Sequence, residues 1–296
     1  MDNIERIAII GFGEAGGILA AGLARNGLGV SVYDIKLHGH EAPAMRRKAE
    51  EAGVRAASGL ADCIGSTQLI VSAVTASSDV EVAEAAANVI RPGQIFLDLN
   101  SVSPVTKQHG QQVIERAGAD FVEAAVMAPV PPYGLAVPML LGGKQAAQLE
   151  PALQRLGFKA QAIAAEIGVA SAVKMCRSVM IKGLEALTVE CLCAARRYGA
   201  EELVLASLRQ TFEKLGADAD PAGYLISRVA EHGRRRAAEM REVSQTLREV
   251  GLEPLMSDAT ARLQDAVVDS MQRCGITYDA AAKFEWRSLA DAFRPE

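Results

Sequence analysis

The first forty residues switch between runs of apolar residues and segments with helical spacing. The apolar run 6–10 enters a glycine-rich turn, an Ala- and Leu-rich segment continues to Gly27, and a second apolar run, 29–33, ends on Asp34. Short β-branched runs are typical of buried strands, and apolar residues at intervals of three and four are typical of a helix. The pattern predicts a strand, a turn, a helix and a second strand, in that order.

Strand signals recur up to about residue 164, with helical segments between them. Further strands are predicted at 68–74, 94–99, 120–126 and 137–141, and helices at about 79–90, 104–117 and 144–156. Ser103 followed by Pro104 marks one helix start, because serine caps a helix N-terminus and proline suits the first helical position. Strands that alternate with helices in this way are the signature of a parallel sheet covered by helices.

The strand signals stop after Gly168. A helical pattern runs over 169–198 and closes on Gly199, and further helical segments are predicted at 201–215, 221–251, 255–273 and 279–292. A helix of about thirty residues is a rod of roughly 45 Å, long enough to leave one domain and cross another. The predicted fold class is therefore α/β. A Rossmann-type, mostly parallel sheet domain over 1–164 precedes an all-helical domain over 165–296, and the long helix joins them.

The glycine-rich turn carries the first candidate chemistry. A Gly-x-Gly-x-x-Gly sequence that follows a strand and opens a helix is the fingerprint of a dinucleotide-binding fold. The first glycine permits a tight turn, the second lets the backbone approach a pyrophosphate, and the third lets the helix pack on the strand. The free N–H groups of the helix N-terminus favour the phosphates. The alternative is a buried turn that binds nothing.

We expect NAD as the cofactor, because Asp34 can accept hydrogen bonds from the adenosine ribose and would repel the 2′-phosphate of NADP. Lys36, Arg46 and Arg47 lie close enough in the sequence to keep NADP open. Asn100, at the carboxyl end of a strand, is a candidate to contact nicotinamide or substrate. The residues expected to bind the cofactor are Gly11, Phe12, Gly13, Glu14, Ala15, Gly16, Asp34, Val74, Thr75 and Asn100.

The long helix carries a second group of candidate functional residues, a polar stripe on an otherwise apolar segment. Its members fall at i, i+3, i+4, i+8 and i+11, so they share one face, and they are Lys174, Arg177, Ser178, Lys182 and Glu185. A helix as apolar as this one is expected to be mostly buried, and its polar stripe to face a cleft or partner charges. A buried ion-pair stripe, for instance Lys182 with Glu185, is the structural alternative.

Composition narrows the class of protein. Half of the 296 residues are hydrophobic, yet no uncharged apolar run approaches the ~20 residues of a membrane helix. The net charge of −5 argues against a nucleic-acid binder, and five cysteines without a CxxC pair indicate reduced thiols. The acidic first residues lead straight into a strand, so no secretory signal is expected. We expect a cytoplasmic enzyme with no metal, no membrane and no nucleic-acid partner.

Four motifs, in order along the chain, resemble those of the β-hydroxyacid dehydrogenase family, the relatives of 3-hydroxyisobutyrate dehydrogenase and 6-phosphogluconate dehydrogenase. They are the glycines 11, 13 and 16, a D-x-S-T-x-S-P-like string at 98–104, the paired glycines 142 and 143, and a glycine followed by a lysine at 168 and 174. The resemblance implies a hydride transfer between nicotinamide and a hydroxy-carboxylic acid. It also implies that Lys174 is the general acid and base, and that the chain forms a homodimer through its helical domain.

Three departures from the family pattern affect the substrate. The family's substrate loop, usually D-A-P-V-S-G-G, aligns with 123–129, where its serine and glycines are replaced. The asparagine four residues after the catalytic lysine is Ser178, which we expect to take a catalytic place there, and the usual methionine of the glycine turn is Ala15. The pattern resembles a less characterised branch whose helical domain is of unknown function. The substrate identity therefore does not carry over from the family.

We expect an anionic small-molecule substrate bound by Ser101, Met127, Arg177 and His232. The guanidinium of Arg177 lies one helical turn from Lys174 and suits a carboxylate, although a structural salt bridge to Glu123 or Glu185 explains it equally well. His232 belongs to a basic run at 232–236, which is either a solvated helix face or reaches the cleft of the same or a partner subunit.

Two other functions stay open. An imine or ketone reductase of the same fold is disfavoured by Lys174, because such relatives commonly lack a lysine at this point. A non-catalytic dinucleotide sensor would keep the glycine turn and would need no polar stripe on the long helix.

Overall fold

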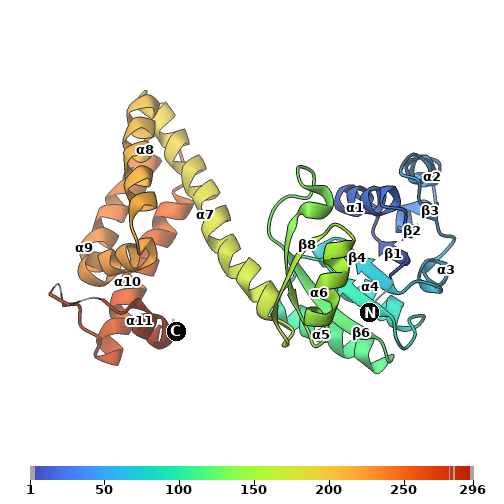
Figure 1. Ribbon diagram of the computed structural model, residues 1–296. Coiled ribbons are helices and arrows are strands. Elements are labelled where there is room, and N and C mark those ends of the chain that lie inside the picture. The colour runs from blue at the N-terminus through green and yellow to red at the C-terminus, as the bar shows by residue number, and fades with distance from the viewer. Residues whose placement is uncertain (1–3, 280, 283, 294–296) are drawn as a thin grey trace. The chain divides into compact units, whose positions relative to one another are not determined.

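The computed structural model describes residues 4–279, 281–282 and 284–293 (Figure 1). The chain divides into two compact units, unit 1 over Met1–Val179 and unit 2 over Met180–Glu296. The division falls inside one helix, α7 (Val169–Arg197). The domain bounds expected from the sequence, 1–164 and 165–296, stay a prediction.

Unit 1 is built on an eight-stranded sheet in the order β3-β2-β1-β4-β5-β6-β7-β8. The strands are β1 (Arg6–Ile10), β2 (Gly29–Tyr33), β3 (Arg55–Ala56), β4 (Leu69–Ser72), β5 (Ile95–Asp98), β6 (Asp120–Val126), β7 (Pro138–Gly142) and β8 (Lys159–Ala164). Every neighbouring pair is parallel except β6 and β7. The predicted fold class is confirmed, and the strand order reverses between β1 and β4, the point at which such sheets bind ligands.

Helices cover both faces of this sheet. They are α1 (Glu14–Arg25), α2 (Ala42–Glu51), α3 (Leu60–Ile64), α4 (Asp79–Ala87), α5 (Pro104–Arg116) and α6 (Ala146–Arg155), with short 3-10 turns η1 (Ile35–Leu37), η2 (Ala76–Ser78) and η3 (Gly134–Ala136). Successive residues of a strand point to opposite faces. Ile7 and Ile9 accordingly join a core with α1, α2 and α6, whereas Ala8 and Ile10 join a core with α3, α4 and α5.

Two strands and two helices of unit 1 were not predicted. β3 has only two residues, Arg55 and Ala56, so it carries no strand pattern. β8 reads Lys-Ala-Gln-Ala-Ile-Ala, with a single β-branched residue. Both are edge strands that pair with one neighbour, β3 with β2 and β8 with β7, the latter with a register shift between Leu141 and Gly142. Pairing with the sheet makes them strands although their own sequences do not favour it. The helix α2 has few large apolar residues, and α3 has only five residues in all.

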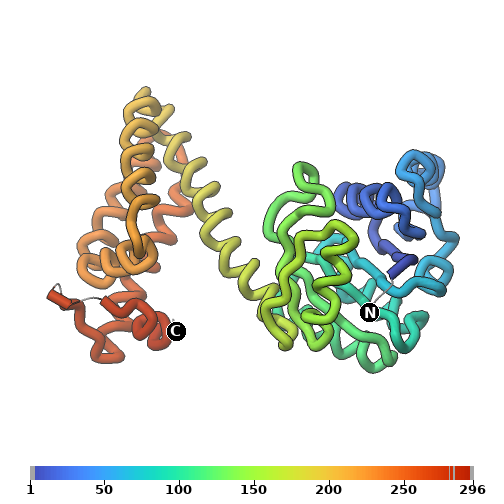
Figure 2. The backbone as a smooth tube through the Cα atoms, in the orientation of Figure 1, coloured from blue at the N-terminus to red at the C-terminus, as the bar shows by residue number. Residues whose placement is uncertain are grey.

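Unit 2 is helical. It contains the second part of α7, then α8 (Glu201–Ala217), α9 (Pro221–Glu249), α10 (Leu255–Cys274) and α11 (Trp286–Ala292). Figures 1 and 2 show α9 and α10 side by side. Glu190 of α7 accepts hydrogen bonds from the N–H groups of Met256 (2.7 Å) and Ser257 (2.9 Å), so a carboxylate caps the start of α10. Among the described helices, none combines the length and apolar character needed to cross a bilayer.

The expectation that the long helix is mostly buried is wrong for the single chain. Val179, Met180 and Val189 are 72%, 56% and 64% exposed. The apolar spacing of α7 correctly predicted a helix, but it does not say which molecule covers the apolar face. Met180, Leu184 and Leu187, at i, i+4 and i+7, share one face of the helix and are 56%, 39% and 41% exposed. An exposed apolar face of this kind marks an interaction site.

Candidate cofactor and active site

The glycine turn between β1 and α1 has the geometry of a dinucleotide site. Gly11 has φ +91°, and a Cβ on it would lie 2.4 Å from the carbonyl oxygen of Ala73. A Cβ on Gly16 would lie 1.9 Å from the carbonyl oxygen of Gly11. No atom lies within 4 Å of the Cβ position of Gly13 among the described residues. The turn thus needs glycine at two positions for its own packing and leaves the third open to a ligand.

Asp34 is bound to the glycine turn. Its Oδ2 accepts a hydrogen bond from the N–H of Phe12 (2.7 Å), and its Oδ1 accepts one from the N–H of Lys36 (3.0 Å). The ammonium of Lys36 pairs with Glu41 at 3.0 Å. The carboxylate at the end of β2 is therefore held rigidly beside the turn, and the nearest basic side chain in sequence already has an acidic partner.

Lys48 of α2 contacts the turn as well, and the sequence did not point to it. Its Nζ donates to the carbonyl oxygens of Phe12 and Gly13, both at 2.7 Å, and lies 4.6 Å from the centroid of the Phe12 ring. The contact spans more than thirty residues along the chain. Arg46 and Arg47, the neighbours that the sequence singled out, are exposed. Only the fold distinguishes Lys48 from them.

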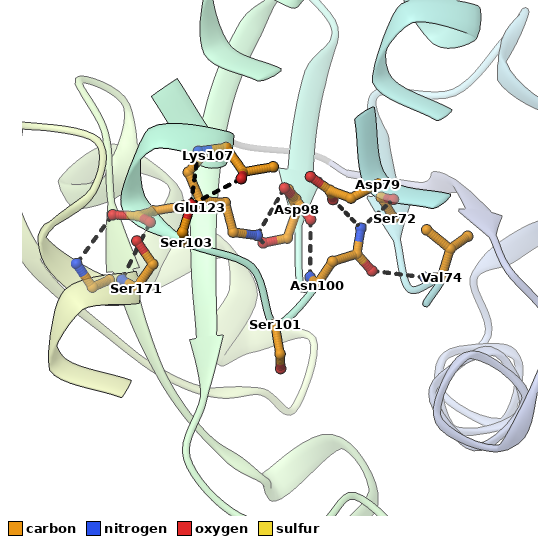
Figure 3. Close-up of polar contacts among 12 residues, drawn as sticks. Ser72, Val74, Asp79, Asp98, Asn100, Ser101, Ser103, Lys107, Glu123 and Ser171 are labelled. Atoms are coloured by element: carbon orange, nitrogen blue, oxygen red, sulfur yellow. Dashed lines mark hydrogen bonds and ion pairs between the residues drawn. The ribbon is translucent and has the colours of Figure 1, made fainter. Parts of the chain in front are cut away.

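Asn100 ties the ends of β4 and β5 together. Its Oδ1 accepts from the N–H of Val74 (2.7 Å), and its Nδ2 donates to Ser72 Oγ (2.9 Å) and Asp79 Oδ1 (2.6 Å). The side chain is buried, so its amide serves to hold these two strand ends in place. Figure 3 shows the amide nitrogen of Asn100 directed toward both Ser72 and Asp79 and its oxygen toward Val74, with the Ser101 side chain pointing away from these bonds.

A buried ion pair lies under the same turn. Lys107 Nζ is 2.7 Å from Asp98 Oδ2 and also donates to the carbonyl oxygen of Asp98 at 3.1 Å. Asp98 Oδ1 accepts from the N–H of Asn100 at 2.9 Å. Burial raises the pKa of Asp98 to about 6, while the ammonium of Lys107 opposes this rise. The segment from Asp98 to Ser101 is thus fixed by charge and by hydrogen bonds from within the core (Figure 3).

Lys174 lies near the start of α7 and reaches this turn. Its Nζ donates to Ser101 Oγ at 2.5 Å, which joins a side chain of α7 to the residue that follows Asn100. The two residues are distant in sequence, and the sequence expected both to act on the substrate. The structure brings them together.

The start of α7 is fixed by a buried carboxylate from β6. Glu123 Oε1 accepts from the N–H groups of Gly168 (2.7 Å) and Ala170 (3.0 Å), and Oε2 accepts from Ser171 (3.3 Å). Glu123 is fully buried. An anion at a helix N-terminus satisfies otherwise unpaired N–H groups and interacts favourably with the helix dipole. The carboxylate therefore positions the turn of helix that carries Lys174, a role that the sequence did not predict.

The salt-bridge alternative for Arg177 is wrong. The oxygens of Glu123 are engaged by the backbone of α7, and no ion pair joins Arg177 to Glu123 or Glu185 within the described residues. Arg177, Lys182 and Glu185 are exposed, so the alternative of a buried ion-pair stripe on α7 is also wrong.

Unit 1 contains a cleft of about 310 Å³ beside Lys174 and Ser101. It is lined by Ala15, Ala73, Val74, Ala76, Leu99, Asn100, Ser101, Val126, Ala128, Pro129, Val130 and Lys174. It brings Ala15 of the glycine turn, the segments that follow β4 and β5, and Lys174 to one place at the carboxyl edge of the sheet. One wall, from Val126 to Val130, is apolar where the family pattern has serine and glycine.

Several expected site residues do not line this cleft. Met127 is half-buried, and its N–H donates to the carbonyl oxygen of Pro138. Arg177 and Ser178 follow Lys174 on α7 without reaching the cleft lining. Thr75 is exposed and bonds to the hydroxyls of neighbouring serines. His232 belongs to unit 2, where its Nε2 lies 3.3 Å from a carboxylate oxygen of Glu231.

Comparison with known proteins identifies the family. Residues 6–165, more than half of the chain, match the NAD binding domain of 6-phosphogluconate dehydrogenase. The chain belongs to this family. Residues 195–267 match a domain of unknown function, DUF1932. The resemblance seen in the four sequence motifs is thereby confirmed, and the sheet unit is the NAD(P)-binding domain of a 6-phosphogluconate dehydrogenase-like protein.

Two solved structures are similar to this family member over most of its length. A conserved hypothetical protein from Sinorhizobium meliloti 1021 is 37% identical, covers 99% of this chain and 96% of its own, and has a TM-score of 0.62. A second, described as a conserved protein of unknown function with structural similarity to 3-hydroxyacid dehydrogenases, is 34% identical with a TM-score of 0.59. The match covers 88% of this chain and 95% of that one.

A more distant neighbour shares the fold alone. A reductive aminase from Aspergillus terreus, solved with NADPH, cyclohexanone and allyl amine, is 17% identical and has a TM-score of 0.74. The match covers 99% of this chain and all of that one. The fold is thus that of NAD(P)-dependent dehydrogenases and reductases, and a nicotinamide dinucleotide is the cofactor class that the family binds.

Proposed function

We propose that the protein is an NAD-dependent dehydrogenase that acts on the CH–OH group of a hydroxy-carboxylic acid, with Lys174 as general acid and base. The observation that carries the proposal is the hydrogen bond from Lys174 Nζ to Ser101 Oγ, in a cleft that is also lined by Ala15 of the glycine turn. When bound, the nicotinamide accepts or supplies the hydride. The chain's own residues have to orient the substrate and move one proton.

Lys174 performs the proton transfer. As a neutral amine it takes the proton of the substrate hydroxyl during oxidation, and as an ammonium it returns a proton to the carbonyl oxygen during reduction. Ser101 accepts a hydrogen bond from Lys174 and keeps its own hydroxyl proton, so it can donate to the substrate oxygen. The buried network at Asp98, Asn100 and Lys107 holds Ser101 at the required place. Ser178 lies one turn further along α7 and is not among the residues that line the cleft, so its catalytic role stays a prediction.

The site favours NAD over NADP. The Asp34 carboxylate is held against the glycine turn by two backbone N–H groups, and a 2′-phosphate beside it would bring two anions together. Lys36 would have to break its ion pair with Glu41 before its ammonium could offset this repulsion.

The substrate is an anion that Arg177 binds. The guanidinium lies one helical turn from Lys174, outside the cleft lining, and forms no hydrogen bond or ion pair with any residue that the structure describes. It has to turn toward the cleft to reach a substrate there. Its planar pair of N–H donors fits a carboxylate. The wall at Ala128 and Pro129 supplies no polar group for that task, so an arginine takes the place of the serine and glycines of the family loop.

The protein is a homodimer that buries the apolar face of α7. Met180, Leu184 and Leu187 share this face and are exposed in the single chain, and removing such apolar area from water is the main favourable term in association. Sedimentation at micromolar concentration would show a species of twice the 31.3 kDa chain mass. A stable monomer would contradict this part of the proposal.

One observation favours a second candidate, a reductase that acts on an apolar ketone or imine. The cleft wall formed by Val126, Ala128, Pro129 and Val130 suits an uncharged substituent. A single panel separates the two candidates: 2- and 3-hydroxy acids with NAD⁺, and apolar ketones and cyclic imines with NADH and NADPH. NADH formation with hydroxy acids supports the dehydrogenase. Turnover restricted to uncharged ketones or imines would replace it with the reductase, and dinucleotide binding without any turnover would favour a sensor.

A further inference from the structure

Unit 2 contains a cavity of its own. It measures about 750 Å³ and lies among α8, α9 and α10, the orange and red helices of unit 2 in Figure 1. Its lining includes three cations, Lys214, Arg228 and Arg236, against a single carboxylate, Asp218. Two features of this lining distinguish it from an ordinary solvated helix surface.

The first feature is a lack of acidic partners. Four other arginines of α9 have carboxylate partners: Arg234 pairs with Asp265 and Asp269, Arg235 with Glu239, Arg241 with Asp265 and Arg248 with Asp258. Arg236 forms no ion pair or hydrogen bond with any described residue, although it is half-buried. Arg228 has Glu231 at 3.4 Å, near the limit of a hydrogen bond. The cavity therefore carries an excess of positive charge.

The second feature is a set of buried polar atoms without partners. Arg228 Nε, Arg236 Nε and Gln264 Oε1 are three of the five buried side-chain atoms that lack a hydrogen-bond partner in the described part of the chain. All three residues line this cavity. Buried polar atoms nearly always have a partner, and exceptions often mark a place where a bound species completes the structure.

The three atoms together specify the chemistry of that species. Two guanidinium groups offer N–H donors in a fork that matches a carboxylate. Gln264 Oε1 is an acceptor, which a carboxylate cannot satisfy but a hydroxyl group can. Leu225 and Val229 supply apolar surface between the polar groups. We infer that this cavity is a binding site for a small carboxylate that also carries a hydroxyl group, held by Arg236 and Arg228 at one end and by Gln264 at the other.

The inference stands without the proposed catalysis, because every residue that carries it belongs to unit 2. The proposed substrate is of the same chemical class, so the experiment has to separate the two sites. Calorimetric titration of 3-hydroxybutyrate, without cofactor, into a Lys174→Ala/Arg177→Gln variant measures binding outside the proposed active site. In that background Arg236→Gln is expected to weaken binding at least tenfold. Arg235→Gln is the matched control, since Arg235 is the preceding residue, exposed and paired with Glu239, and it should change the Kd less than twofold.

Thermal unfolding supplies a second readout. Arg236→Gln removes a group that has no protein partner, so the Tm without ligand should be unchanged, while the rise in Tm caused by 3-hydroxybutyrate should disappear. Butyrate, which lacks the hydroxyl, should bind more weakly than 3-hydroxybutyrate, and Gln264→Leu should remove that difference. Equal effects of the 235 and 236 variants, equal affinity for both acids, or a weakened dimer in Arg236→Gln would overturn the inference. A weakened dimer would show that Arg236 contacts a second copy of the chain.

Discussion

Lys107 Nζ lies 2.7 Å from Asp98 Oδ2, and neither side chain is more than 3% exposed. The other oxygen of Asp98 accepts from the N–H of Asn100, so the ion pair supports the turn that carries Ser101. A buried ion pair adds little net stability over an apolar pair, but loss of one partner leaves an uncompensated charge. We therefore expect the Asp98–Lys107 pair to determine where this turn lies and what charge lies beneath it, more than to add net stability.

Asp98→Asn should change how the stability of the protein depends on pH. Burial raises the pKa of Asp98 from 3.8 to about 6. The folded state then holds the proton more tightly than the unfolded chain does. The stability contributed by Asp98 is consequently greatest below about pH 4 and is lost as the pH rises through about 6.

Urea unfolding of the wild type and of Asp98→Asn between pH 4 and 8 measures this contribution. The wild type should gain stability relative to the variant as the pH falls. Asp62→Asn is a control of opposite sign, because the Ser58 N–H and the Arg55 guanidinium hold the pKa of Asp62 below 3.8. Its contribution is present at neutral pH and is lost as the pH falls. A difference between wild type and Asp98→Asn that does not vary with pH would contradict the shift.

Glu123→Gln should lower both stability and catalysis. The buried carboxylate accepts three N–H groups at the start of α7, and the amide places a donor among them, at a cost of about 1–3 kcal/mol for a buried group left unpaired. Because the same turn carries Lys174, kcat should fall as well. Glu190→Gln is the matched control, since Glu190 caps α10 in the same way. Both variants should lower Tm, and equal effects of the two on kcat would contradict a positioning role for Glu123.

Cofactor preference should depend on the charge of Asp34. In the wild type, kcat/KM with NAD⁺ should exceed that with NADP⁺ by at least about tenfold, which corresponds to about 1.4 kcal/mol. Asp34→Asn keeps an oxygen for the N–H of Phe12 but removes the repulsion of a 2′-phosphate. Its NAD⁺ to NADP⁺ ratio should fall toward one. A wild type that prefers NADP⁺ would refute the assignment.

Arg177→Lys should raise KM for the hydroxy acid and leave Tm nearly unchanged. The lysine keeps the charge but loses the two-pronged geometry of the guanidinium, and Arg177 is exposed without a structural partner in the described chain. We expect an increase in KM of about tenfold, a typical value for loss of one charged contact. Arg197→Lys, at the far end of the same helix, is the control. A fall in Tm with unchanged kinetics would show that Arg177 belongs to the scaffold.

The parts of the site that the sequence could predict depend on local patterns. The glycine turn was predictable because its backbone requires glycine at two positions. Gly11 has a positive φ, and Gly16 lies too close to the carbonyl oxygen of Gly11 to carry a Cβ. Lys174 and Ser101 were found through motifs that lie within a few residues of each. The structure shows their contact across 73 positions of the chain. The motifs along the chain identified the two residues, and the fold of the parallel sheet brought them together at one edge.

The parts that could not be predicted depend on distant neighbours. Lys48 and Lys107 read as ordinary helix lysines, and only the fold places one on the glycine turn and the other beside Asp98. Glu123 looked like a member of the substrate loop, but it is a buried helix cap. The apolar face of α7 indicated burial, whereas its exposure shows that periodicity identifies an apolar face without identifying its partner.

The general acid/base role of Lys174 is the central claim, and Lys174→Ala tests it most directly. The measurement is single-turnover hydride transfer at saturating cofactor, followed by NADH absorbance, together with the Kd of NADH from fluorescence. The rate should fall by about 10²–10⁴, the usual contribution of a general acid or base. The Kd should stay within about twofold of the wild type, because the dinucleotide phosphates are bound at the glycine turn. A variant that transfers hydride at the wild-type rate would contradict the account.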